Sequence, residues 1–165
     1  KETLLKAAAP KSAARPVPEE TTEQTLAVPR EVFITRFDFQ RLKELIAVAR
    51  GFGGEEFARH LDDLDRELSA GRIVDPKSVP ADVVTMNSRV RLRDVETGES
   101  VVRSLVFPVD AGKAPENTSV LDSMGTSLLG YRVGSIIEVI EAQMKKRYQV
   151  EEILYQPESA GDYHL

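Results

Sequence analysis

The segment Leu121-Asp122-Ser123-Met124-Gly125-Thr126-Ser127-Leu128-Leu129-Gly130, followed by Tyr131-Arg132-Val133-Gly134-Ser135, is the most informative part of this 165-residue sequence. Its pattern predicts a short amphipathic helix with both ends specified. Asp122 or Ser123 can accept hydrogen bonds from the free N–H groups of the first turn. Gly130 can adopt the left-handed conformation just past the last turn. We therefore expect one short helix here, with strands before and after it.

The sequence on both sides of this helix is typical of β-strands. β-branched and other apolar residues alternate with polar ones, which indicates half-buried strands. Glycine at position 98 favours a hairpin turn over residues 96–99, and a second turn is expected over 143–146. Residues 110–117 are polar and predict a loop. The predicted strands cover residues 88–94, 101–107, 135–141 and 147–154, which gives a bent antiparallel sheet with one short helix.

Earlier residues predict two helices joined by a glycine turn. After a short strand over 31–35, Asp38 occupies a position suited to an N-cap. Apolar residues then recur at helical spacing on either side of Gly51, Gly53 and Gly54. Gly71 ends the second helix. The expected seams are Phe39, Leu42, Ile46 and Ala49 on the first helix, and Phe57, Leu61, Leu64 and Leu68 on the second. Together with the sheet, this short antiparallel hairpin places the chain in the α+β class.

The sequence divides into three regions. Residues 1–29 are rich in Ala, Pro, Lys, Glu and Thr and lack apolar periodicity, so we expect a disordered extension. Residues 30–79 form the short strand and the hairpin, a short coiled coil. Residues 80–165 form the sheet domain. Because the first residue is Lys1 and not Met, we expect a fragment, a processed form or a tagged chain.

Bulk properties exclude several functional classes. The formal charge of −5 and the pI near 5.2 argue against direct sequence-specific DNA binding, which normally needs a basic face. The absence of cysteine excludes disulfides, thiolate nucleophiles and cysteine-based zinc sites. No apolar run is long enough to span a membrane. We expect a cytoplasmic protein with no membrane partner.

Several motifs carry a family resemblance. The pattern Gly125-x-x-Leu128-Leu129-Gly130-x-x-Val133-Gly134 resembles the C-terminal domain of the GreA/GreB family of bacterial transcript-cleavage factors. Residues 83–90 and 155–163 resemble the branch of that family (Rnk) named as regulators of nucleoside diphosphate kinase. The resemblance runs from about residue 31 to residue 165. It implies an FKBP-like fold for the sheet domain, and it implies RNA polymerase as the partner.

The resemblance also implies roles for two groups of residues. In the family, the helix segment grips the rim of the polymerase secondary channel, and the matching residues here are Asp122, Ser123, Met124, Gly125, Thr126 and Ser127. We expect Met124 to offer an adaptable contact surface. Family members also extend a long coiled coil into the channel, where an Asp-x-x-Glu pair at the tip holds magnesium for RNA cleavage. Here the hairpin tip presents Arg50, Phe52, Glu55 and Glu56, and the arms are short.

The tip therefore predicts binding without cleavage. Glu55 and Glu56 are adjacent, so on a helix they diverge by about 100° and chelate one ion poorly. An alternative role for them is to favour the first turn through the helix dipole. We predict no metal, no cofactor and no catalytic residue. The chain would compete with Gre-type factors at the polymerase secondary channel without stimulating cleavage.

Other interpretations remain open. The chain could regulate nucleoside diphosphate kinase by direct contact, or indirectly through transcription. It could be a weak transcript-cleavage factor, or a prolyl isomerase by analogy of fold. Asp62, Asp63 and Asp65 predict a solvated helix face, with Asp62 pairing to Arg66 at i+4. His60 and His164 have no plausible partners in the sequence and are expected at the surface. Ile73, Val74 and Val79 are expected to anchor the hairpin on the sheet domain.

Overall fold

A computed structural model describes residues 31–165, so the predicted extension over 1–29 lies outside the described residues. A helical hairpin comes first, formed by α1 (Arg36–Ala49) and α2 (Glu55–Ala70). Two short strands, β1 (Phe33–Thr35) and β2 (Arg72–Val74), pair in parallel at its base. Backbone hydrogen bonds therefore join the start of α1 to the end of α2. They stabilise the hairpin, which at this length would be only marginally stable in isolation.

The predicted seams form the contact between the two helices. Leu42, Ile46 and Ala49 are buried on α1, and Leu61, Leu64 and Leu68 are buried on α2. Phe39 and Phe57 pack against the same cluster from partly exposed positions. Gly71 caps α2 as predicted. Apolar spacing alone therefore identified the inner faces of both helices.

The start of α1 differs from the prediction. Thr35 is the N-cap, and its hydroxyl accepts a hydrogen bond from the Asp38 N–H at 3.2 Å. Asp38 lies in the first turn of the helix and is buried, although an aspartate so placed usually faces solvent. Both Thr35 and Asp38 are suitable caps by type. Pairing of β1 with β2 keeps Thr35 extended, so the helix begins at Arg36.

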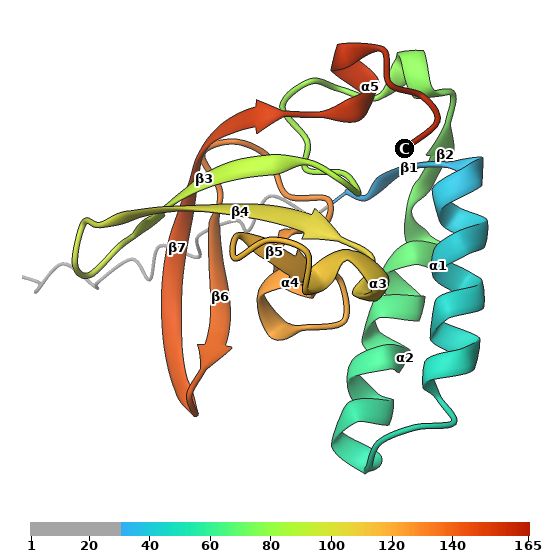
Figure 1. Cartoon of the computed structure of the whole chain (residues 1–165), viewed down its shortest axis with the longest axis horizontal. Coiled ribbons are helices and arrows are strands. Elements are labelled where there is room, and N and C mark those ends of the chain that lie inside the picture. The colour runs from blue at the N-terminus through green and yellow to red at the C-terminus, as the bar shows by residue number, and fades with distance from the viewer. Residues whose placement is uncertain (1–30) are drawn as a thin grey trace, which may run out of the picture.

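Five strands form a bent sheet in the order β5-β4-β3-β7-β6 (Figure 1). All neighbours are antiparallel except β4 and β5, which are parallel. The α+β class and the curled sheet are confirmed. The predicted loop over 110–117 instead begins inside α3 and ends at β5. The bounds are β3 (Arg89–Asp94), β4 (Ser100–Val106), α3 (Pro108–Ala111), β5 (Asn117–Ser119), α4 (Ser123–Leu128), β6 (Ile136–Glu141), β7 (Met144–Tyr155) and α5 (Pro157–Ala160), with a 3-10 turn over Pro76–Ser78.

Both predicted sheet turns exist, and the second is tighter than expected. Gly98 has φ of 76° in the β3–β4 turn. Between β6 and β7 only Ala142 and Gln143 turn the chain, with φ values of 49° and 64°. Two successive residues in the left-handed region make a turn whose twist matches the flanking strands. As a result, β7 begins at Met144 and extends over 12 residues.

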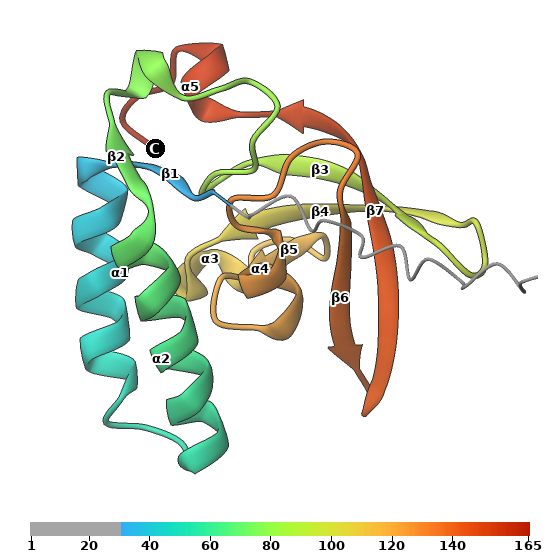
Figure 2. The ribbon, with the colours of Figure 1, turned by 180° about the vertical axis from the view of Figure 1, so that it is seen from behind.

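Helices and sheet share one hydrophobic core. Buried residues of α1 and α2 belong to the same cluster as those of the sheet and α4. The hairpin lies along the side of α3 and α4, away from the β6–β7 hairpin, in both views (Figures 1 and 2). Of the three predicted anchors, Val79 is buried, whereas Ile73 is 45% exposed. The division at residue 79 therefore stays a prediction, since the core runs across it.

None of the helices within residues 31–165 combines the length and the apolar character that a membrane crossing requires.

Candidate functional site

The short helix α4 has the ends that its sequence predicted. Asp122 takes the extended N-cap conformation, although its side chain makes no capping hydrogen bond. Gly130 has φ of 81° just past the C-terminus. A side chain at Gly130 would meet Val32 Cγ2 at 2.7 Å, so this glycine also allows the chain before β1 to pass close by.

The helix α4 is fastened to strand β6, an outer strand of the sheet. The Ser123 hydroxyl accepts a hydrogen bond from the Ile140 N–H at 3.0 Å. The Ser127 hydroxyl donates to the Glu138 carbonyl at 3.0 Å. These bonds satisfy two polar groups on the free edge of β6, which would otherwise be open to pairing with another chain. Both serines therefore hold α4 in place.

Exposure separates the six residues predicted to bind polymerase into two sets. Met124, Gly125 and Thr126 are buried by the fold itself. Asp122 is exposed, and Ser123 and Ser127 are half-buried. Only 7% of Met124 is exposed and it packs in the core, so it offers little surface in this conformation, and its expected role as an adaptable contact stays a prediction. Asp122, Ser123 and Ser127 can present atoms to a partner without a change of fold.

A shallow groove adjoins the exposed side of α4. Its volume is about 300 Å³, and it runs between α4, β5 and the end of β6. Arg103, Asn117, Asp122, Ser123 and Glu141 contribute its polar lining. Such a lining provides hydrogen-bond donors and acceptors together with charges of both signs, which suits a polar protein surface better than a buried apolar ligand.

The hairpin tip presents one apolar and two acidic side chains. Phe52 is 72% exposed, and Glu55 and Glu56 are exposed in the first turn of α2. Arg50 instead belongs to the hairpin framework, because its guanidinium contacts Asp62 at 3.0 Å and Asp65 at 3.1 Å on α2. All four predicted tip residues are exposed, and Arg50 differs from the others in being held by ion pairs across the hairpin.

The acidic cluster on α2 connects the two helices. Asp65 pairs with Lys43 of α1 as well as with Arg50, the residue that caps α1. The predicted Asp62–Arg66 pair is wrong: Arg66 contacts Asp63 at 3.1 Å. Helical spacing allowed either pairing, and the approach of α1 gave Asp62 and Asp65 cationic partners from the other arm of the hairpin.

His60 is the clearest site residue that sequence reasoning missed. Its Nε2 lies 3.0 Å from the Leu121 carbonyl oxygen and 2.9 Å from the Thr126 hydroxyl. The surface position predicted for His60 is therefore wrong, whereas His164 is exposed as expected. No pattern in the sequence pairs position 60 with positions 121 and 126, since packing of the hairpin on α4 creates the contact.

A pair of buried carboxylates lies where the hairpin meets the C-terminal residues. Asp38 on α1 is 3% exposed, and its Oδ1 makes no hydrogen bond. Burial and the nearby charge of Glu158 raise the pKa of Asp38 to about 6, against the opposing effects of Arg41 and the Thr35 hydroxyl. Glu158 is 8% exposed and accepts a 2.8 Å hydrogen bond from Thr85. This arrangement costs folding free energy at neutral pH.

The described residues contain no cluster suited to a metal. Within residues 31–165, no group of three or more His, Asp or Glu side chains could hold an ion. Glu55 and Glu56 therefore have no third ligand nearby.

Comparisons with known proteins agree on one relationship. Residues 79–155 match the family described as transcription elongation factor GreA/GreB, C-terminal. The regulator of nucleoside diphosphate kinase of Escherichia coli K12 is 36% identical over 135 residues, covering 81% of this chain and 96% of that protein. The chain belongs to the GreA/GreB family. Its similarity to the regulator of nucleoside diphosphate kinase extends through the hairpin as well as the sheet.

Two further proteins of this family are also similar to the chain. The GreA elongation factor of Chlorobium phaeobacteroides is 33% identical over 95 residues, covering 57% of this chain and 60% of that protein. A solved GreA/GreB elongation factor from Nitrosomonas europaea superposes with a TM-score of 0.66 at 33% identity, covering 76% of this chain and all of that one. These relatives are regulators or elongation factors, and the fold of this chain is that of a GreA/GreB factor.

Proposed function

We propose that this GreA/GreB family member binds RNA polymerase near the secondary channel and competes there with Gre-type factors, without stimulating RNA cleavage. Support for a transcription role comes from relatives named as transcription elongation factors. The similarity to a regulator of nucleoside diphosphate kinase, over 81% of this chain, supports regulation over catalysis. A cytoplasmic location follows from the proposed partner.

The observation that carries the proposal is the chemistry of the hairpin tip. Glu55 and Glu56 occupy adjacent positions at the start of α2, so their side chains diverge by about 100° around the helix. A magnesium ion bound through protein carboxylates needs them to converge on one point. The tip can therefore occupy a channel and exclude another factor, while it lacks the paired carboxylates that would recruit a catalytic ion.

We further propose that α4 provides the docking contact. Asp122, Ser123 and Ser127 would touch polymerase, while the buried Met124, Gly125 and Thr126 hold these side chains in place. Asp122 carries the single charge in this segment and is exposed. An acidic residue at the edge of an interface contributes most when it meets a cationic surface.

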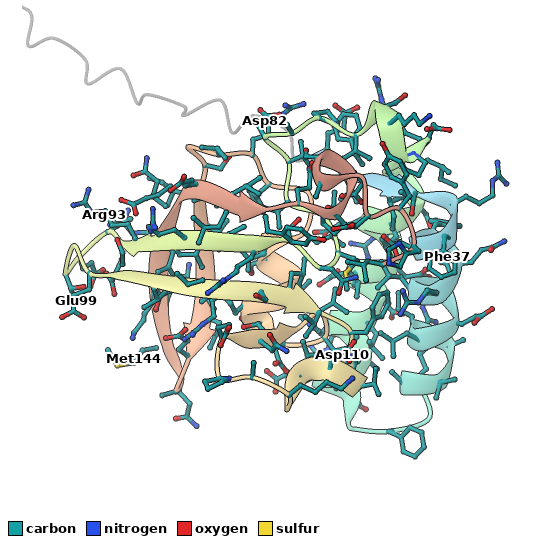
Figure 3. All side chains as sticks on the ribbon, turned by 45° about the horizontal axis from the view of Figure 1, so that its top comes forward. Phe37, Asp82, Arg93, Glu99, Asp110 and Met144 are labelled. Atoms are coloured by element: carbon teal, nitrogen blue, oxygen red, sulfur yellow. The ribbon has the colours of Figure 1, made fainter. Side chains whose placement is uncertain are left out.

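The docking contact is tested by competition. Labelled Gre factor is bound to core RNA polymerase, and this chain is titrated in. We expect the native chain to displace the label, and Asp122→Arg to need at least about tenfold more protein because it reverses a contacting charge. Glu99→Arg is the matched control, since Glu99 lies in the β3–β4 turn at the end of the molecule away from the hairpin (Figure 3). No displacement by the folded native chain would reject the polymerase proposal.

A second prediction concerns the acidic tip residues. Replacing both Glu55 and Glu56 with alanine should change the displacement of Gre factor by less than about threefold, because exposed carboxylates contribute little to binding unless they are paired. Neither form should stimulate cleavage in backtracked transcription complexes. Magnesium-dependent cleavage by the native chain, lost in the double variant, would show instead that the tip holds a catalytic ion.

One alternative has a specific observation behind it. A relative that covers most of this chain is named a regulator of nucleoside diphosphate kinase, so the chain could act by contacting that kinase directly. Co-purification of the kinase with this chain, with no polymerase present, would favour direct contact. Changed kinase levels without any contact would point back to transcription.

A further inference from the structure

The side chain of His60 joins the hairpin to the docking helix. His60 lies on α2, whereas its partners, Leu121 and Thr126, lie just before α4 and within it. Both contacts use the same ring nitrogen, Nε2, at 3.0 Å from the Leu121 carbonyl oxygen and 2.9 Å from the Thr126 hydroxyl oxygen. Residues more than 60 positions apart in sequence are thus linked by one side-chain atom.

The surrounding hydrogen bonds fix where the proton lies. The Thr126 hydroxyl donates its single proton to the Val120 carbonyl at 2.7 Å, so its oxygen must accept from His60. The Leu121 carbonyl can only accept. Nε2 therefore carries a proton that is shared between two acceptors.

Several residues of the hairpin and its base contact the C-terminal residues, and among His60, Arg41, Asp38 and Val32 it is His60 that lies closest to the tip. It is the sixth residue of α2, roughly 8 Å of helix from Glu55. On α1, the Arg41 guanidinium stacks on the Phe107 ring, 3.9 Å from the ring centroid. Asp38 and the contact of Val32 with Gly130 lie near the base. Replacing His60 removes the hydrogen bonds from this part of α2 to Leu121 and Thr126.

We propose that His60 is a positioning residue, which holds the hairpin tip at a fixed distance from Asp122, Ser123 and Ser127 so that both ends meet the same partner at once. The inference rests on the proposed binding to polymerase. When one rigid molecule carries two contact sites, binding at the first site places the second at a high effective concentration. The two sites together therefore bind a partner more tightly than either site alone. A tip that swings freely loses that advantage and must be ordered when it binds.

The tether itself is tested without polymerase. Since the sequence has no cysteine, Glu56→Cys and Lys145→Cys give a unique pair of spin labels, one at the tip and one at the β6–β7 turn. Pulsed EPR should show one narrow distance distribution. We expect His60→Leu to broaden it, and His60→Gln to preserve it, because the glutamine amide can still donate from a similar place. Arg59→Leu, at the exposed neighbouring position, should leave it narrow.

The binding role is tested in the cysteine-free protein by displacement of labelled Gre factor. His60→Leu should need about tenfold more protein than the native chain, and His60→Gln should stay within about threefold. Thr126→Val removes one of the two His60 contacts and leaves the one with Leu121, so it should cost less than His60→Leu and should add no loss to it in the double variant. Unfolding in urea confirms that each variant is folded.

Each contrary result has one meaning. An unchanged distance distribution in His60→Leu would overturn the tether. A broadened distribution with unchanged displacement would show that the tether does not serve binding, which also overturns the proposal. Failure of the native chain to displace Gre factor would reject the proposed function itself, and it is distinguished by the distance measurement, which needs no polymerase.

Discussion

Replacing Gly125 with alanine should cost about 3–5 kcal/mol of folding stability, or prevent folding altogether. A Cβ at this position would lie 1.9 Å from the Ser119 carbonyl oxygen and 2.6 Å from its carbonyl carbon. Both atoms belong to the backbone of the segment that leads from β5 into α4. Because Ser123 and Ser127 fasten α4 to β6, the helix cannot move away to relieve the overlap.

Equilibrium unfolding in urea, followed by circular dichroism, measures this loss. Gly112→Ala is the matched control, since Gly112 has φ of −83° and a Cβ added there would have no atom within 4 Å. The control should change stability by less than about 0.5 kcal/mol, or raise it slightly through the unfolded chain. Equal stability of the two variants would mean that α4 does not lie against Ser119. The expected result identifies Gly125, prominent in the family motif, as a packing residue.

Replacing Asp38 with asparagine should raise stability at pH 7 by roughly 2–3 kcal/mol, because each pKa unit corresponds to about 1.4 kcal/mol. The pKa of Asp38 is raised from 3.8 to about 6 by burial and by Glu158. Asparagine keeps the shape of the side chain and removes the buried charge. The native arrangement therefore lowers stability at the junction of hairpin and C-terminal residues.

The pH dependence gives the sign of this effect. Between about pH 4 and 6 the folded state binds a proton at Asp38 that the unfolded state has released, so native stability falls as pH rises through this window. The difference between Asp38→Asn and the native chain should be greatest above about pH 6 and vanish below about pH 4. Using the difference cancels the contribution of other carboxylates, such as Asp94, whose pKa is lowered by backbone N–H groups of Thr97 and Glu96.

A surface aspartate provides the comparison for Asp38. Asp63→Asn removes a charge on the exposed side of α2, where the Asp63 side chain is 64% exposed and contacts Arg66. It should change stability by less than about 0.5 kcal/mol at any pH between about 4 and 8. If Asp38→Asn behaved in the same way, the Asp38 carboxylate would have to be solvated in the folded protein.

Local sequence patterns predicted the elements that depend on neighbouring residues. Apolar spacing identified both hairpin seams, because buried positions on a helix repeat every three or four residues. Gly130 and Gly98 marked a helix end and a turn correctly, since each requires a positive φ. The exposed tip followed from its glycines and charges, and Phe52, Glu55 and Glu56 are accessible as expected.

The sequence predicted where the site residues lie in the chain, but not which of them are exposed. The motif over Asp122–Ser127 was correctly placed on a short helix, but half of its members face inward. A helix of six residues has too few turns for periodicity to show which side is covered. The sequence therefore located α4 without revealing that Met124 and Thr126 are buried.

The family, the helical hairpin, the short helix and most of the sheet could be predicted from local patterns, because each depends on residues close together in the chain. Which side chains meet across the core depends instead on the tertiary structure. It paired His60 with Thr126, buried Asp38 near Glu158, and gave Asp62 and Asp65 partners on the other arm of the hairpin. These contacts join residues that are far apart in sequence, and they form because one hydrophobic core brings the hairpin against the sheet.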